Sequence, residues 1–393
     1  MKHIILGNGP AGVVAAETLR RVSPADEILL VGNEDEPPYS RMAIPYLLEG
    51  DIDESGTYLR KADDHFAALG IGQHRGRAVA VNSEKQTILF DDGHFESYDR
   101  PLIATGSHPV RPPIPGIDLP AVQTCWTLED ARAIADLARP GSRVLQLGAG
   151  FIGCIIMESL VKRGVHLTVV ELGDRMVPRM MTPEAGSMIK RWVEKQGVRV
   201  VTGAGVERIE EGASAPLTVT LTTGDQIDCE LLIVAAGVAP NVAFLDGADV
   251  HVAKGVLVDD TMQTSVPGIY AAGDVAEAPD LFSGRHLVAA IQPNAADQAR
   301  IAALNMAGQA ARMSGVLAIN VLDSMGMISS SFGEWQGVAG GDGVEKAEQL
   351  AREIRLEVGV VAPAVGVDLV LVGIDQLGIG MFGDFERDFR ERM

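Results

Sequence analysis

The chain has 393 residues, 47% of them hydrophobic, which suits two to four domains at about 100 to 200 residues per domain. Its formal net charge of −20 argues against nucleic acid or an anionic membrane as a partner, because both are bound by positive patches. We find no signal segment and no run of about 18 apolar residues that could span a membrane. We therefore expect a folded cytoplasmic protein.

The chain opens with a pattern typical of dinucleotide binding: an apolar strand, a G-x-G-x-x-G turn, a helix and a second strand. The turn contains Gly7, Gly9, Pro10, Ala11 and Gly12. Its glycines allow a tight turn and a close approach of backbone to a pyrophosphate, and the N-terminus of the next helix favours phosphate. The second strand is expected at residues 27–31, and Gly32 takes the position directly after it. The expected ribose carboxylate, Glu34, therefore lies further along than the motif requires.

The next segments carry one candidate cation and one small-residue turn. Arg41 follows two prolines in the loop at residues 34–50, where it is either a solvated loop charge or a cation that meets phosphates. Residues 58–69 are predicted to be helical, and residues 76–91 to form two β segments. At Ala104, Thr105, Gly106 and Ser107, small residues at a strand end would let backbone lie against a cofactor.

The same nucleotide-binding pattern recurs after a proline-rich linker at residues 109–120. An apolar strand at residues 144–147 leads into a second turn with Gly148, Gly150, Phe151, Ile152 and Gly153. Glu171 ends the following strand at about the 20-residue distance where a carboxylate accepts the ribose hydroxyls. A carboxylate there repels a 2′-phosphate, so the sequence favours NADH over NADPH.

The rest of the chain is expected to finish the second unit and return to the first. A helix is predicted at residues 183–196, with strands at residues 198–201, 217–221 and 231–235. Residues 268–272 are predicted to form a strand ending at Gly273 and Asp274, whose carboxylate is suited to a ribityl hydroxyl, and residues 294–311 to form an alanine-rich helix. The glycine- and valine-rich end of the tail favours strands, which must be buried against the body or a partner subunit.

The cysteines and histidines indicate no thiol or metal centre. Cys125, Cys154 and Cys229 lie far apart without C-x-x-C spacing, so the sequence predicts neither a redox dithiol nor a protein-bound iron-sulfur cluster. We expect Cys154 and Cys229 to be core residues, whereas Cys125 is not placed. The eight histidines are scattered, and no metal site is predicted.

Together these motifs resemble the FAD-dependent pyridine nucleotide oxidoreductases, in the branch of ferredoxin and rubredoxin reductases, NADH oxidases and nitrite reductase flavin domains. The resemblance implies an α/β fold with two Rossmann-like domains and bound FAD and NAD(H). Its domains would be an FAD domain at 1–110 and 240–315, an NAD domain at 111–239 and a small α+β interface domain at 316–393. It implies FAD ligands at Gly7, Gly9, Pro10, Ala11, Gly12, Glu34, Arg41, Val79, Ala104, Thr105, Gly106, Gly273 and Asp274, and NAD ligands at Gly148, Gly150, Phe151, Ile152, Gly153, Glu171 and Gly237.

Two departures from that family bear on the mechanism. Met42 stands where the disulfide reductases carry their redox cysteine, and a thioether cannot cycle through a thiolate. Ferredoxin reductases have a lysine after the same loop, paired with a glutamate after the second turn. Tyr46 and Ile155 take these two places, so the pair is replaced as a unit without leaving an unpaired charge.

These features lead to one main hypothesis and two alternatives. Hydride transfer between nicotinamide and flavin needs stacking and exclusion of water, so no side chain is expected to be catalytic. We expect an NADH:acceptor oxidoreductase that works with an iron-sulfur protein, or as the NAD-coupling subunit of an oligomer or larger redox complex such as a tungsten- or molybdenum-type aldehyde oxidoreductase. The alternatives are an NADH oxidase that reduces oxygen, and a non-catalytic protein whose interactions depend on FAD and NAD.

Overall fold

The structure is a computed structural model that describes residues 1–332 and 371–374. The chain divides into two compact units, each described here by itself. Unit 1 comprises Met1–Ala43, Ile52–Pro109 and Val238–Ala318. Unit 2 comprises Ile44–Asp51, Val110–Gly237 and the chain from Ile319 onward. Residues 44–51 thus belong to unit 2, whereas the expected FAD domain contained all of residues 1–110. The boundaries of the expected domains stay a prediction.

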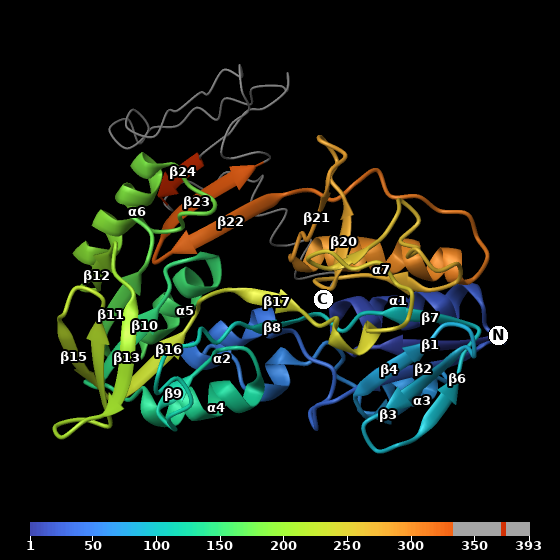
Figure 1. Cartoon of the computed structure of the whole chain (residues 1–393), viewed down its shortest axis with the longest axis horizontal. Helices are drawn as coiled ribbons and strands as arrows, with labels where there is room; N and C mark the ends of the chain where they lie inside the picture. Colours follow the sequence, from blue (N-terminus) through green and yellow to red (C-terminus); the bar gives the residue numbers. More distant parts are fainter. Residues whose placement is uncertain (333–370, 375–393) are drawn as a thin grey trace. The chain divides into compact units, whose positions relative to one another are not determined.

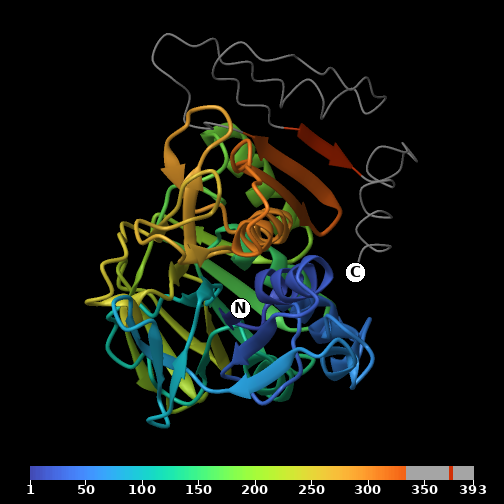
Figure 2. The same ribbon diagram turned by 90° about the vertical axis from the view of Figure 1, so that its right-hand side faces the viewer.

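Unit 1 is built on a parallel five-stranded sheet in the order β19-β7-β1-β2-β3. Its strands are β1 (Lys2–Leu6), β2 (Glu27–Gly32), β3 (Gly72–Arg75), β7 (Arg100–Ile103) and β19 (Tyr270–Ala271). The helices α1 (Pro10–Val22) and α7 (Gln292–Met306) pack against each other beside the sheet (Figures 1 and 2). The core is apolar, since Ile4, Ile5 and Leu102 are fully buried.

Smaller elements complete unit 1. One antiparallel sheet joins β4 (Ala78–Asn82), β5 (Thr87–Phe90) and β6 (Phe95–Ser97), a second joins β8 (Ser107–Pro109) to β17 (Val238–Pro240), and a third joins β18 (Val256–Leu257), β20 (Ala276–Pro279) and β21 (His286–Leu287), with β18 parallel to β20. The short helices are η1 (Arg41–Ala43), η2 (Glu54–Thr57), α3 (His65–Ala68) and η3 (Ala243–Leu245).

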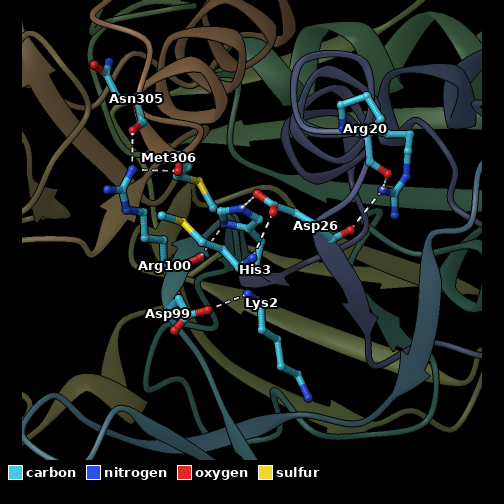
Figure 3. A network of polar contacts seen from close by, with 10 residues as sticks. Lys2, His3, Arg20, Asp26, Asp99, Arg100, Asn305 and Met306 are labelled. Carbon is cyan, nitrogen blue, oxygen red and sulfur yellow. Dashed lines mark hydrogen bonds and ion pairs between the residues drawn. The ribbon is translucent and has the colours of Figure 1, made fainter.

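A polar network holds the amino end of β1, at the opposite end of the strand from the first glycine turn (Figure 3). The fully buried His3 places its ring nitrogens 3.3 Å from the Arg100 carbonyl oxygen and 3.0 Å from the Asp26 carboxylate. Arg100 also donates to the carbonyls of Asn305 and Met306 at the end of α7, and so satisfies orphan acceptors of that helix. The network therefore connects β1, β7 and α7.

Three sequence predictions in unit 1 need correction. Helix was predicted over 58–69, but only His65–Ala68 is helical, because Tyr58 forms a β-bridge with Tyr39 and the Leu59 amide donates to the Pro38 carbonyl (2.9 Å) at the start of this stretch. The predicted helix 294–311 runs only from Gln292 to Met306, and Gly308, whose φ of 82° favours glycine, follows its C-cap Ala307. The predicted strand 268–272 is reduced to Tyr270–Ala271.

Unit 2 repeats the parallel arrangement in the order β12-β11-β10-β16-β9. The strands are β9 (Val122–Gln123), β10 (Arg143–Leu147), β11 (His166–Glu171), β12 (Arg199–Thr202) and β16 (Leu231–Val234), with helices α2 (Ile44–Glu49), α4 (Leu128–Leu137), α5 (Phe151–Lys162) and α6 (Pro183–Lys195) (Figure 1). An antiparallel sheet of β13 (Val206–Glu211), β14 (Leu217–Leu221) and β15 (Gln226–Cys229) completes this core. The helix predicted at 183–196 and the three predicted strands of this region are confirmed within one or two residues.

The described part of the tail forms an antiparallel sheet of β22 (Ile319–Ser324), β23 (Met327–Phe332) and β24 (Leu371–Ile374). Trp192 of α6 donates to the carbonyls of Ser324 and Met325, both at 3.1 Å, which ties the β22–β23 turn to unit 2. Strands predicted elsewhere in the tail fall at residues 333–370 and 375–393, outside the described residues. Within the described part of the chain, no helix has the length and apolarity needed to cross a membrane.

Candidate functional site

The first glycine turn has the shape that a pyrophosphate requires. A Cβ atom at Gly7, whose φ is 115°, would collide with the Ala104 carbonyl, and one at Gly12 would collide with the Gly7 carbonyl. Nothing lies within 4 Å of the Cβ position of Gly9, and α1 begins at Pro10 without a side-chain cap. Open space therefore faces uncapped N–H groups at a helix N-terminus, which is the arrangement that binds phosphate.

The other two expected FAD segments lie against this turn. Ala104 contacts Gly7 as described, and Gly106, with a φ of 64°, has open space at its Cβ position. At the end of β19, Gly273 lies so close to α1 that its Cβ atom would be 3.2 Å from the Cβ of Ala11. Three segments far apart in sequence thus meet at the carboxyl ends of the parallel strands, where ligands bind in such sheets.

Asp274 lies at this convergence and is held by Ser107, which the sequence placed in the small-residue strand end but not among the ligands. The Ser107 hydroxyl donates to the Asp274 carboxylate at 2.9 Å. Burial raises the pKa of Asp274, while the bond from Ser107 and the positive charge of Arg41 act in the opposite direction. A buried carboxylate with capacity left to accept a hydrogen bond fits a ribityl hydroxyl donor.

Glu34 and Arg41, both expected FAD ligands, form an ion pair at 2.6 Å. Tyr39, which is 7% exposed, connects them because it donates to Glu34 (2.5 Å) and accepts from Arg41 (2.7 Å). Sequence analysis missed Tyr39, although it stands between the two prolines and the arginine of the PPYSR motif. The ion pair fixes both side chains, so neither is a freely solvated loop charge.

Thr105 and Val79 differ from the other expected FAD ligands. The Thr105 hydroxyl donates to the Asn241 carbonyl at 2.9 Å, so it secures the loop. Val79 lies at a register break in β4 and is 39% exposed. None of the contacts above involves Val79, whose role as an FAD ligand stays a prediction.

The second glycine turn, in unit 2, has the same construction. A Cβ atom at Gly148, whose φ is 106°, would collide with the Ala235 carbonyl, and one at Gly153 would lie 2.5 Å from the Gly148 carbonyl. The Cβ position of Gly150 is open, and α5 begins at Phe151 and Ile152 without a side-chain cap. This turn therefore fits the pyrophosphate of NAD(H) as the first fits that of FAD.

Glu171, the expected ribose ligand, supports the turn. Its carboxylate accepts the amides of Ala149 (2.7 Å) and Gly173 (2.8 Å), and the residue is 9% exposed. Each carboxylate oxygen has capacity for a further donor, as the two ribose hydroxyls require.

Strand register explains why the two expected acids have different spacings. The Gly148 amide donates to Val170, as the Gly7 amide donates to Val31, so Gly32 occupies the place of Glu171. The Asn8 side chain fills the space beside Gly32, where unit 2 has Ala149. The carboxylate of unit 1 is consequently displaced to Glu34.

Gly237 lies in the loop between β16 and β17, and Arg175 and Arg179 lie in the loop between β11 and α6. Gly237 has a φ of 114°, and its Cβ position lies 3.9 Å from the guanidinium of Arg179. Arg175 is held by the Met181 carbonyl (2.9 Å) and by Asp174 (2.7 Å). Arg179 is exposed and has no hydrogen bond or ion pair within residues 1–332. Of these two cations, Arg179 is the one able to turn toward a ligand.

The described residues contain no thiol pair. Cys125, Cys154 and Cys229 are all free and buried, and burial raises the pKa of each thiol to about 12. Met42, at the position of the family cysteine, is 49% exposed. A protonated buried thiol is neither a nucleophile nor a redox relay at neutral pH.

The helices in which the family lysine and glutamate are replaced do carry another ion pair. Glu49 of α2 accepts from Lys162 of α5 at 2.6 Å, and the Glu49 side chain is 7% exposed. The bond to Glu49 raises the pKa of Lys162, and Glu158 adds a second carboxylate at 3.1 Å. The replacement of the family pair by Tyr46 and Ile155 stays a prediction, and the structure shows that α2 and α5 are joined by the Glu49–Lys162 ion pair.

Comparison with known proteins identifies the family. The model of the pyridine nucleotide-disulphide oxidoreductases matches residues 1–303. The chain is 32% identical over 371 residues to the NADH-dependent phenylglyoxylate dehydrogenase subunit epsilon of Aromatoleum evansii, covering 93% of this chain and 87% of that one. It is also 32% identical over 333 residues to an NADH oxidase of Methanocaldococcus jannaschii, covering 81% and 72%.

A solved structure agrees with these relatives. The ferredoxin reductase for the CYP199A2 system of Rhodopseudomonas palustris has a TM-score of 0.79 and 28% identity, covering 84% of this chain and 82% of that one. The predicted α/β class with two Rossmann-like folds is confirmed, as are FAD and NAD(H) as the cofactors. The chain therefore belongs to the pyridine nucleotide-disulphide oxidoreductase family and is an FAD-dependent NAD(P)H oxidoreductase.

Proposed function

We propose that this protein is an NADH:acceptor oxidoreductase that exchanges single electrons with an iron-sulfur protein or subunit. The observation that carries the proposal is the replacement of the family cysteine by Met42, together with three separate buried cysteines whose thiol pKa values are about 12. Without a thiol relay among the described residues, electrons have to pass directly between flavin and acceptor.

The side chains of this protein bind and orient the two cofactors and exclude water from them. The turn at Gly7–Gly12, Glu34, Arg41 and Asp274 would hold FAD, and the turn at Gly148–Gly153 with Glu171 would hold NAD(H). The bound cofactors supply the hydride and electron-transfer chemistry. The protein supplies their position, since reacting groups held at contact distance remove much of the entropic barrier.

The relatives support a protein acceptor. One is named as a subunit of an NADH-dependent dehydrogenase, and one structure is a ferredoxin reductase. We propose the same role here: an NAD-coupling subunit in a larger redox complex, or a reductase that meets a separate ferredoxin-like protein in the cytoplasm. Electron flow in either direction is compatible with this role. We propose a tungsten- or molybdenum-type aldehyde oxidoreductase as one complex of which the chain would be a subunit.

Copurification from the native source tests the partner directly. A tagged chain should retain an iron-containing protein that is reduced anaerobically by NADH only when this flavoprotein is present. Recovery of the chain alone, with no reduction of any added ferredoxin, would refute the proposed acceptor.

An NADH oxidase is the second candidate, and the name of the archaeal relative favours it. Oxygen consumption with NADH, measured against reduction of an added ferredoxin, separates the two activities. The non-catalytic alternative predicts that NADH does not bleach the flavin absorbance within seconds in a stopped-flow experiment.

A further inference from the structure

Gln146 is a polar residue in the middle of the core of unit 2. It lies in β10, pairs in register with Val169 and Ile233, and is fully buried. Its amide nitrogen donates to the carbonyls of Gly148 (2.8 Å) and Gly153 (3.0 Å). Among the residues that the structure describes, its amide oxygen has no hydrogen-bond partner. A flipped amide would set that oxygen against two carbonyl oxygens, so the two acceptors fix the orientation.

An unpaired buried oxygen costs free energy, so its retention needs a reason. Unit 1 shows that the fold does not need an amide here. Ile5 occupies the equivalent place, two residues before the first glycine, and is fully buried with its methyl group against Gly12. The amide is therefore specific to the turn of unit 2.

The two carbonyls that Gln146 binds belong to peptide groups at the two ends of the turn. The Gly148 carbonyl shares a planar peptide group with the Ala149 amide, which donates to Glu171 at 2.7 Å. The Gly153 carbonyl shares one with the Cys154 amide, which donates to Gly150 at 2.9 Å. The Gln146 side chain thus holds both ends of the turn, and through one peptide group it is connected to Glu171.

We propose that Gln146 is a positioning residue for NAD(H): it preorganises the turn at Gly148–Gly153 and the carboxylate of Glu171 before the coenzyme binds. The proposal rests on the assignment of this turn to NAD(H). Because a rigid turn loses less entropy on binding, removing the clamp should weaken coenzyme binding and leave the subsequent transfer step unchanged.

The test compares Gln146→Met with Leu145→Met, both in flavin-loaded protein. Leu145 is a buried neighbour on the same strand that belongs to the apolar cluster on the other face of the sheet, so it controls for a change in core packing. Calorimetric titration with NAD⁺, without any acceptor, should give a Kd about tenfold higher for Gln146→Met, the effect expected for two neutral hydrogen bonds. Amide hydrogen exchange at residues 149–154 should also accelerate, and the limiting rate of flavin reduction by NADH should not change.

A second measurement separates positioning from packing. If Gln146 acts through Glu171, the effects of Gln146→Met and Glu171→Gln on the Kd should be non-additive in the double variant. Unchanged affinity and exchange in Gln146→Met, additive effects, or an equal loss in Leu145→Met would overturn the proposal. Should Gln146→Met fold poorly, Gln146→Ile repeats the test with the side chain that unit 1 tolerates. Failure of the proposed iron-sulfur acceptor would leave these NAD⁺ results unaffected.

Discussion

Replacing Glu171 should change the preference for NADH over NADPH through two separate effects. The carboxylate repels the 2′-phosphate of NADPH, but it also accepts the amides of Ala149 and Gly173. Glu171→Gln removes the charge and leaves one side-chain oxygen for two backbone donors. We therefore expect NADPH to improve and NADH to weaken, rather than a gain for NADPH alone.

The structure sets the expected size of both effects. Two like charges about 5 Å apart repel by about 3 kcal/mol at an effective dielectric of about 20, and salt reduces this to about 2 kcal/mol. That corresponds to a preference of roughly 30-fold for NADH in the unmodified protein. Losing a hydrogen bond to a charged group costs about 1.5 to 3 kcal/mol, so NADH binding should weaken about tenfold in Glu171→Gln. A gain of roughly 30-fold for NADPH and a loss of about tenfold for NADH should together turn the preference for NADH into a preference of roughly tenfold for NADPH.

The assay is kcat/KM for NADH and NADPH with a dye as acceptor, at low and high salt. Adding Arg179→Ala to Glu171→Gln should remove part of the gain for NADPH, because Arg179 is an exposed cation without a partner within residues 1–332. Equal kcat/KM for the two coenzymes in the unmodified protein would refute the assignment of Glu171.

Three further predictions concern FAD, thiols and pH. Arg41→Ala and Asp274→Ala should each weaken FAD binding by about ten- to a hundredfold, as lost charge-assisted hydrogen bonds would, whereas full flavin retention on a desalting column would contradict their assignment. Replacing all three cysteines with alanine should leave NADH-to-dye turnover per bound FAD intact, and anaerobic titration should end at about two electrons per FAD, not the roughly four that an active disulfide adds. Burial opposes ionisation of Glu17, but the bonds from Arg60 lower its pKa below the usual value, so its stabilisation is present above about pH 4.5 and is lost as the pH falls. Glu17→Gln should accordingly lower the Tm at pH 7 and have little effect near pH 3; an equal loss at both values would contradict the pKa shift.

Local patterns were sufficient to predict both nucleotide-binding turns. Gly7 and Gly148 are required by their positive φ, and Gly12 and Gly153 by close packing on the carbonyls of Gly7 and Gly148, so these requirements arise within one βαβ unit. The helical prediction at 58–69 was wrong because a contact from Pro38 determines that conformation. Periodicity within a window contains no information about such a contact.

The partners of site residues were harder to predict than the residues themselves. Ser107 and Asp274 are 167 positions apart in the sequence, and Tyr39 connects Glu34 to Arg41 only after the loop has folded back on itself. The spacing rule for the acidic residue assumes that the strand ends at the carboxylate. At Glu171 the strand does end at the carboxylate, whereas in unit 1 Gly32 occupies the equivalent position and Glu34 lies further along.

The ion pair between α2 and α5 was not predicted when the sequence was compared with the family pattern. At the aligned positions, Tyr46 and Ile155 indicate that a charged pair has been lost. Within unit 2, however, Glu49 is almost buried and must have a cation nearby, since an unpaired buried carboxylate is costly. Lys162 supplies that cation from α5, and the Ser159 hydroxyl donates to the same carboxylate at 3.1 Å. The two helices are therefore connected by an ion pair whose glutamate lies on α2, the helix on which the resemblance implied a lysine.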